Sequence, residues 1–288
     1  MTRMADMQGN AKMLAAAAAL VLALPPACAF YIPGAPGALH SSRRAALQPQ
    51  LRMSAAPPEE LSLPETLVLN EDERRKNNMA ADTFFYSDPK LCFHVDQGFL
   101  NRLTDLYRER IPAGGAVLDL MSSWVSHLPP EISYKRVDAT GMNERELDKN
   151  PRLDSKRVWD LNCDPRVPFE SETYDAVTCA VSVQYLQRPE TVFADVCRVL
   201  KPGGVAIVSF SNRMFFDKAI SAWIARGDME RAKLVCQYFQ AAGGYEKPEV
   251  IASSNPLVTG FLGDFGRSVL GLNLGGDPFL AVVARKKP

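Results

Sequence analysis

Two acidic residues stand where short apolar runs of the chain end. Asp119 follows Ala116–Leu118, and Asp160 follows Arg157–Trp159. A carboxylate at such a position accepts hydrogen bonds from hydroxyl or amino groups. In open α/β sheets, ligands bind outside the carboxyl ends of the strands. If both runs are parallel strands of one sheet, Asp119 and Asp160 mark the edge at which a ligand would bind.

The residues after Asp119 permit two interpretations. Ser122 and Ser123 offer hydroxyl and backbone N–H groups, which would suit a ligand carboxylate if a helix began there. Alternatively, the bulky side chains of Met121 and Trp124 fill this space, and ligand binding is lost or altered. The residue types leave both interpretations open.

The elements that would position these residues alternate along the chain. Strands are predicted over 116–120, 134–139, 157–160, 174–181, 205–209, 249–253 and 279–284, and helices over 95–110, 143–150, 189–200, 214–226 and 229–242. The run 174–181 is almost wholly apolar, as expected for a strand buried on both faces. The order predicts an α/β fold, namely a Rossmann-like, doubly wound, mostly parallel seven-stranded sheet with helices on both faces. The last two strands have no helix between them and predict an antiparallel edge strand.

The composition excludes several classes of protein. The 288 residues are 47% hydrophobic and 23% charged, which argues against a disordered, collagen-like or coiled-coil chain. The six cysteines form no CxxC pair and show no spacing typical of a zinc site or a disulfide framework, so we expect reduced thiols and no metal. No apolar stretch is long enough for a stable membrane span.

The composition of the first 53 residues predicts a leader that directs the protein to a cellular compartment. Residues 13–24 form an apolar run of signal-peptide length, and Ala27–Ala29 offers small residues for cleavage. Residues 30–58 contain no acidic residue, which is typical of a transit peptide. We therefore expect a signal peptide at 1–29, a transit peptide at 30–53 and a flexible lead-in at 54–83, before a domain at 84–288.

This leader resembles the bipartite leader of algae with complex plastids, in which phenylalanine follows the first cut, as Phe30 does here. The resemblance implies a plastid location. The alternative is secretion, with a disordered N-terminus.

The strongest resemblance to a known family lies in Pro168–Gly204. The run PFESETYDAVTCAVSVQYL, followed by VFADVCRVLKPGG, resembles the fourth strand and following helix of class I S-adenosylmethionine-dependent methyltransferases, in the small-molecule branch called type 11. The similarity extends over roughly residues 84–285. It implies S-adenosylmethionine as cofactor and a small molecule as methyl acceptor.

Two loops depart from that family. Its first loop carries glycines, as in D-x-G-x-G-x-G, which let the backbone approach the methionine part and the ribose of the cofactor. Here no glycine stands between Asp119 and Pro129. The family also has an acidic residue at the end of the second strand, where this chain has Gly141. Asn143 could instead bond the ribose or simply cap the helix that follows it.

The resemblance implies the following site residues. For the cofactor they are Asp119, Met121, Ser122, Ser123, Asn143, Asp160, Leu161, Asn162 and Val181; for the acceptor they are Gln184, Tyr185, Asn212 and Arg213. Asp160 would receive the adenine amino group, or else cap its own loop. Methyl transfer from a sulfonium needs positioning more than a fixed catalytic group, and a base only if the acceptor is protonated. Tyr86, His94 and Tyr185 are candidates for that role.

The sequence is thus compatible with two functions. The first is methyl transfer to a small molecule in a plastid, and the alternative is a non-catalytic protein of the same fold, such as an assembly or regulatory factor. Nicotinamide-dependent oxidoreduction is disfavoured, because no GxGxxG opens the first helix.

The zero net charge of the chain hides two unlike parts. Residues 1–53 have five basic residues and one acidic residue, which leaves 28 basic and 32 acidic residues from Ser54 onward, a net charge of −4. A mildly acidic body favours a small-molecule substrate over a nucleic acid. The oligomeric state does not follow from the sequence.

Overall fold

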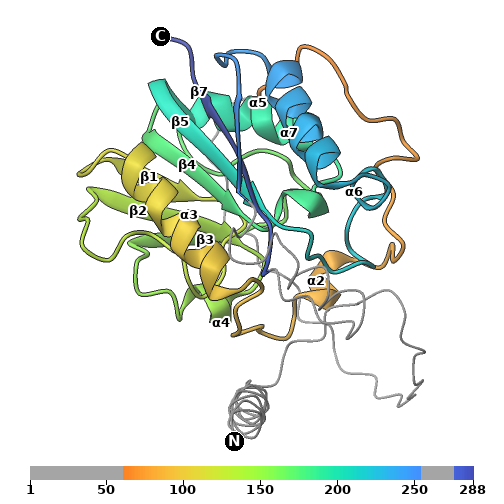
Figure 1. Ribbon diagram of the computed structural model, residues 1–288, viewed down its shortest axis with the longest axis horizontal. Coiled ribbons are helices and arrows are strands. Elements are labelled where there is room, and N and C mark those ends of the chain that lie inside the picture. Colours follow the sequence, from red (N-terminus) through yellow and green to blue (C-terminus); the bar gives the residue numbers. More distant parts are fainter. Residues whose placement is uncertain (1–60, 254–275) are drawn as a thin grey trace, which may run out of the picture. The chain divides into compact units, whose positions relative to one another are not determined.

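The computed structural model describes residues 61–253 and 276–288, and these build one seven-stranded sheet (Figure 1). The predicted signal and transit peptides lie outside the described residues. The strand order is β3-β2-β1-β4-β5-β7-β6, and only β7 runs antiparallel to its neighbours, so the predicted fold class is confirmed. The order reverses between β1 and β4, and this is the topological switch point at which such sheets bind ligands.

The seven strands are short and largely buried. They are β1 (Ala116–Asp119), β2 (Arg136–Gly141), β3 (Ser155–Val158), β4 (Tyr174–Ala180), β5 (Leu200–Phe210), β6 (Glu249–Ser253) and β7 (Phe279–Arg285). The register pairs Asp119 with Ala139 of β2 and with Thr178 of β4. Asp119 therefore lies at the carboxyl end of the central strands, as its sequence position predicts.

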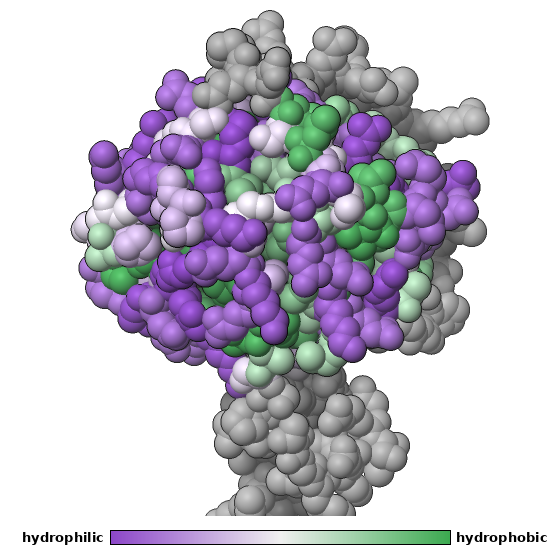
Figure 2. Space-filling model, turned by 90° about the horizontal axis from the view of Figure 1, so that it is seen from above, coloured by the Kyte–Doolittle hydropathy of each residue, from purple (hydrophilic) through white to green (hydrophobic). Residues whose placement is uncertain are grey.

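Helices cover the sheet on both faces. They are α2 (Asp82–Phe85), α3 (Gln97–Arg110), α4 (Glu144–Leu147), the 3₁₀ turn η2 (Val183–Tyr185), α5 (Pro189–Val199), α6 (Ser221–Ile224) and α7 (Asp228–Ala242). Side chains alternate along each strand, so Val117 packs with α3 on one face and Leu118 packs with α5 and α7 on the other (Figure 1). Viewed from above, the surface is mainly hydrophilic, with small separate apolar patches (Figure 2).

Two predicted elements differ most from those observed, and the helix predicted over 143–150 is also shorter, because α4 covers only Glu144–Leu147. The helix predicted over 214–226 is reduced to α6, because the N–H of Phe215 bonds the hydroxyl of Tyr185 and residues 215–219 close into turns. The strand predicted over 157–160 ends at Val158, which leaves Asp160 in the following turn. In both places, tertiary contacts outweigh the local pattern.

Residues 61–83 make specific contacts with the domain, although their composition predicts a flexible lead-in. Arg74 is buried and donates to both carboxylate oxygens of Glu190 on α5, at 2.9 and 3.0 Å. Lys76 and Lys218 both pair with Asp82. The charge run at 71–76 is therefore in part a buried anchor and not a wholly solvated segment.

Cys163, Cys179, Cys197 and Cys236 are free thiols, as predicted, whereas Cys92 is disulfide-bonded, so the prediction of reduced cysteines is wrong at that position. None of the helices formed by residues 61–253 and 276–288 is long and apolar enough to cross a membrane.

Candidate functional site

The loop after β1 uses its own backbone donors within the protein. Residues 120–135, all of which are described, form no helix before β2 begins. The N–H of Met121 donates to the Thr140 hydroxyl at 3.2 Å, and the N–H of Ser122 donates to the Thr140 carbonyl at 2.6 Å. The interpretation that places Ser122 and Ser123 at a helix N-terminus is therefore wrong. These amides face β2 rather than an open site.

Gly141 ends β2 because no side chain fits there. A Cβ atom at this position would lie 2.5 Å from the carbonyl oxygen of Ser122, closer than nonbonded atoms approach. The loop after β1 thus occupies the space into which an acidic side chain at the end of β2 would extend. The absence of that acid from the sequence has a steric cause.

Asp119 lies beneath the loop with its carboxylate almost fully enclosed. Its exposed fraction is 3%, and it accepts hydrogen bonds from the hydroxyls of Ser122 at 2.6 Å and Thr178 at 3.1 Å. Burial raises the pKa of Asp119 to about 6, although hydroxyl donors partly oppose this shift. A carboxyl group with such a pKa is a candidate for proton exchange near neutral pH.

A cavity of about 80 Å³ lies at the carboxyl ends of β1 and β4, which is the topological switch point. Its walls come from residues 92–95, from Asp119 and the loop 121–127, and from residues 180–182. Three of these wall residues have left-handed backbone conformations, namely Met121 and His127 with φ of 55° and Val181 with φ of 51°. Such conformations are costly for residues other than glycine, above all for a β-branched one, and they cluster at functional sites.

Residues 84–95, here called the closing segment, cover this edge of the sheet. Asn143 donates to the carbonyls of Tyr86 and Ser87, and Glu146 accepts the N–H of Lys90 at 2.6 Å. The indole N–H of Trp124 donates to a carbonyl of the segment at 3.3 Å. The segment is thus hydrogen-bonded both to the loop after β1 and to α4.

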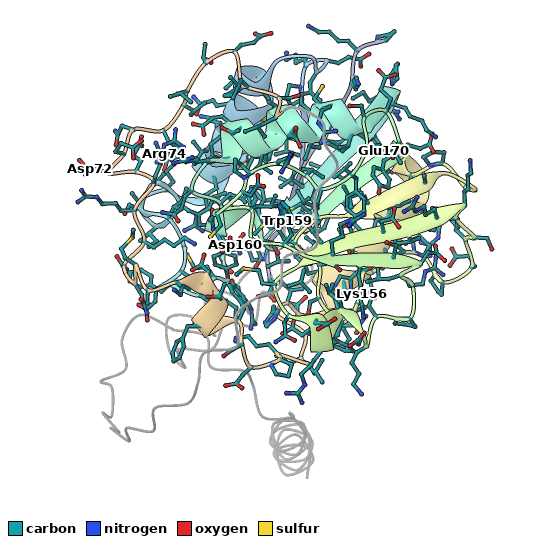
Figure 3. All side chains as sticks on the ribbon, turned by 180° about the vertical axis from the view of Figure 1, so that it is seen from behind. Asp72, Arg74, Lys156, Trp159, Asp160 and Glu170 are labelled. Atoms are coloured by element: carbon teal, nitrogen blue, oxygen red, sulfur yellow. The ribbon has the colours of Figure 1, made fainter. Side chains whose placement is uncertain are left out.

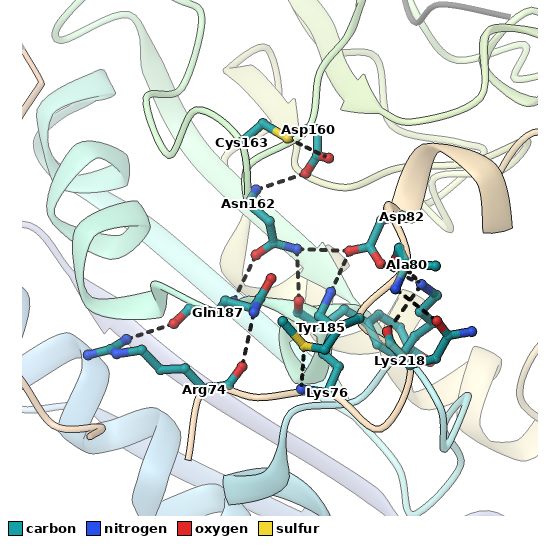
Figure 4. Close-up of polar contacts among 12 residues, drawn as sticks. Arg74, Lys76, Ala80, Asp82, Asp160, Asn162, Cys163, Tyr185, Gln187 and Lys218 are labelled. Atoms are coloured by element: carbon teal, nitrogen blue, oxygen red, sulfur yellow. Dashed lines mark hydrogen bonds and ion pairs between the residues drawn. The ribbon is translucent and has the colours of Figure 1, made fainter. Parts of the chain in front are cut away.

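The loop after β3 is closed by its own side chains. Asp160 lies next to Trp159 after the end of β3 (Figure 3). It accepts the N–H of Asn162 at 2.9 Å and the thiol of Cys163 at 3.2 Å (Figure 4). The Asn162 amide donates to Asp82 and to the carbonyl of Tyr185 (Figure 4). These bonds correspond to the loop-capping role weighed for Asp160, and the adenine contact stays a prediction.

The remaining predicted cofactor residues also form hydrogen bonds or core contacts within the protein. Asn143 caps α4 by accepting the N–H of Glu146 at 3.1 Å, while its amide group holds the closing segment. The hydroxyl of Ser123 donates to Glu146 at 2.6 Å, and Leu161 is buried in the core. In this arrangement, Asn143, Ser123 and Leu161 are all engaged by other parts of the protein.

The predicted acceptor residues differ in exposure and in hydrogen-bond partners. Gln184 and Tyr185 are buried in η2, and the Tyr185 hydroxyl, whose pKa burial raises to about 12, accepts the N–H of Phe215. Asn212 and Arg213 are exposed, and Arg213 pairs with Asp277.

Of the candidate bases, His94 lines the cavity, and burial lowers its pKa to about 4. Burial also raises the pKa of Tyr86, well above its ordinary value. His94 is therefore neutral at physiological pH, and Tyr86 keeps its proton.

Sequence reasoning left two residues of the site unassigned. His127 lines the cavity beside His94, and burial lowers its pKa to about 4. Glu146 has no role in the sequence analysis, yet its carboxylate joins the loop after β1 to the closing segment. Its place directly after β2 is the one sequence signal that could have drawn attention to it. Among the described residues, no group of three or more His, Cys, Asp or Glu side chains could hold a metal ion.

The cavity that the described residues enclose at this edge is smaller than a whole S-adenosylmethionine molecule needs. Pockets for ligands of that size enclose about 300–1,000 Å³, and this cavity holds about 80 Å³. The space next to β2 is filled by Ser122, and the amides of the loop are bonded to Thr140.

Comparison with known proteins bears on the same strands. Residues 131–208, which run from β2 into β5, match the methyltransferase domain family. A curated mitochondrial 2-methoxy-6-polyprenyl-1,4-benzoquinol methylase from Caenorhabditis elegans is 41% identical over 70 residues, which are 24% of this chain and 24% of that protein. The chain therefore spans about a quarter of the length of this relative.

Two of the solved structures that match this chain do so at low sequence identity. Phosphoethanolamine N-methyltransferase 2 of Haemonchus contortus, solved with S-adenosyl-L-methionine, is 17% identical, with a TM-score of 0.47 over 68% of this chain and 54% of that one. A methyltransferase-like protein of Bacillus halodurans is 15% identical, with a TM-score of 0.44 over 67% of this chain and 100% of that one.

Proposed function

We propose that this chain, whose residues 131–208 match a methyltransferase domain, transfers a methyl group from S-adenosylmethionine to a small-molecule acceptor. The observation that supports this most is the position of the cavity. It lies at the switch point between β1 and β4, where open α/β sheets bind ligands, and it contains a buried carboxyl group and strained backbone.

Two further observations support a small acceptor in a plastid. The acidic balance of the chain from Ser54 onward disfavours a nucleic acid, and the curated relative is by its name a methylase of a quinol. The leader composition supports delivery to a plastid. A fluorescent protein fused to residues 1–60 should accumulate in plastids of an alga with complex plastids, and its secretion would contradict the location.

The alternative is a methyltransferase-fold protein that does not use this cofactor. It is favoured by the packing at Gly141, where the loop after β1 fills the space beside β2, and by the small volume of the cavity. Such a protein could act through its surface as an assembly or regulatory factor.

Ligand binding separates the two functions. A ligand that binds only the folded state raises its melting temperature, by an amount that grows with concentration. S-adenosylmethionine and S-adenosylhomocysteine at millimolar concentration should each raise the melting temperature of the full chain. Replacing Ser182, on the cavity wall, by Trp should abolish that rise, whereas Ser171→Trp, at an exposed turn before β4, should not. Lack of any rise with the unmodified chain would favour the non-catalytic function.

A further inference from the structure

The cavity at the carboxyl ends of β1 and β4 has one acidic side chain in its wall and no basic one. Its described lining residues include Asp119, but neither lysine nor arginine. The carboxylate of Asp119 accepts a hydroxyl hydrogen bond on each oxygen, from Ser122 and from Thr178. Because the two oxygens of a carboxylate offer about four acceptor positions, Asp119 keeps acceptor capacity for a ligand in the cavity.

No lysine or arginine of the described residues forms an ion pair with Asp119. His94 and His127 also line the cavity, and both are neutral at physiological pH, because burial lowers the pKa of each to about 4. Lys90, whose charge acts on His94, donates its ammonium N–H to the Phe85 carbonyl at 2.9 Å. Since buried carboxylates are normally paired, the missing counter-charge points to a ligand that brings a positive charge.

Aromatic rings form another part of the same wall. The centroid of the Phe93 ring lies 4.9 Å from that of Trp124 and 6.2 Å from that of His127. Phe93 lines the cavity and is 52% exposed, so its ring lies at the cavity mouth. The faces of phenylalanine and tryptophan rings attract organic cations, so this wall favours a ligand of the same charge as Asp119 does.

The volume of the cavity restricts the ligand to a small group. The cavity encloses about 80 Å³, which is about half of the roughly 150 Å³ of a protein cavity that holds benzene. A group of about four non-hydrogen atoms, such as a trimethylammonium head, corresponds to that volume.

We infer that this cavity binds an organic ammonium group, with Asp119 as its counter-ion and Phe93 and Trp124 against its carbon atoms, and that the methyl acceptor is an amine. The second part rests on the proposed function. The amine would release a proton to the Asp119 carboxylate, and its nitrogen would form a bond to the methyl carbon of S-adenosylmethionine. The carbon–sulfur bond would break at the same time and leave S-adenosylhomocysteine. Burial raises the pKa of Asp119 to about 6, which makes its carboxylate a better proton acceptor than an exposed one.

Binding of three small probes to the full chain tests the ammonium site. Trimethylammonium is the cation, tert-butanol is a neutral molecule of similar size, and acetate is an anion. The indole N–H signal of Trp124 in NMR spectra reports binding, because Trp124 lines the cavity while Trp159 and Trp223 are core residues. Trimethylammonium should shift this signal saturably and bind at least about tenfold more tightly than either of the other probes.

Three variants separate the charge from the rings. Asp119→Asn removes the charge and keeps the shape, so it should weaken trimethylammonium binding about tenfold or more. Phe93→Leu should weaken it about threefold. Asp105→Asn, the same change at an exposed position of α3, should leave it unchanged. Equal binding of the three probes, or unchanged binding in Asp119→Asn, would overturn the inference, even if S-adenosylmethionine raises the melting temperature and the proposed function stands.

Saturating S-adenosylhomocysteine distinguishes an amine acceptor from the sulfonium cation of the cofactor. If the site belongs to the acceptor, trimethylammonium should still shift the Trp124 signal when S-adenosylhomocysteine is bound. Loss of that shift would assign the site to the cofactor and overturn the amine acceptor. If trimethylammonium binds but neither S-adenosylmethionine nor S-adenosylhomocysteine raises the melting temperature, the ammonium site is supported, while the proposed function and the amine acceptor are both wrong.

Discussion

Two crossover units of the same sheet are built differently. β4 and β5 are joined by α5, whose apolar face packs with α7 and the sheet, whereas β1 and β2 are joined by residues 120–135 without a helix. In the first unit, backbone groups are satisfied locally by the helix. In the second, Met121 and Ser122 bond to Thr140 across the sheet edge. A unit that lacks its helix must satisfy its backbone through specific partners, and this unit is the one beside the candidate site.

The difference also appears in the acidic residues of the two units. Asp119, at the end of β1, is buried without a cation, and its pKa is raised. Asp175 lies in β4, and although burial alone would raise its pKa, Lys201 and the N–H of Ala116 lower it. The carboxylate of Asp175 forms an ion pair with Lys201. The carboxyl group of Asp119 is buried without a cation, although burial disfavours its charged form. Groups of the second kind are typical of functional sites.

The largest expected effect comes from restoring the acid at the end of β2. Gly141→Asp should lower the free energy of unfolding by more than about 4 kcal/mol, because the new Cβ overlaps the Ser122 carbonyl and a charge is buried. Gly203→Asp in β5 is the control, since nothing lies within 4 Å of its added Cβ. Its positive φ should cost about 1 kcal/mol. Denaturant unfolding measures both, and similar losses would mean that the loop is not packed as described.

The next effect concerns the pH dependence of stability. Because the pKa of Asp119 is raised on folding, its contribution is full below the unfolded value of 3.8 and is lost as pH rises through about 6. Asp119→Asn should therefore stabilise the protein by about 2 kcal/mol at pH 8 and by little at pH 4. For Asp175, whose pKa is lowered, the contribution is present above 3.8 and lost as pH falls. Asp175→Asn should destabilise the protein at pH 8, and thermal unfolding at both pH values would reveal whether the two signs are opposite.

The smallest effect is expected at the position of the family's first glycine. Met121→Gly relieves a left-handed backbone but loses partial burial and increases the entropy of the unfolded chain. The net change should stay within about 1 kcal/mol. Leu120→Gly, which empties a 2% exposed core position beside it, should cost more than about 3 kcal/mol in the same unfolding assay. Equal losses would show that Met121 is a core residue and not a strained one.

Much of the fold follows from local pattern. The apolar runs at β1, β4 and β5, and the helices α3, α5 and α7, appear where hydrophobic periodicity places them, because each buries its own apolar residues. The helix predicted over 214–226 fails because the Phe215 amide is taken by Tyr185, a residue 30 positions away. The packed segment at 61–83 was missed because its anchor, Glu190, lies on α5.

The sequence by itself determined the order of strands and helices, the position of Asp119 at the carboxyl edge, and the missing glycines and missing acid of the two loops. These features depend on residues that are neighbours in the chain, so they can be inferred from residue types and spacing alone. Only the tertiary structure decided that Ser122 fills the space beside Gly141 and that Asn143 and Glu146 hold the closing segment. Each of these depends on which distant segments meet, and that is set by packing of the whole domain rather than by any local run.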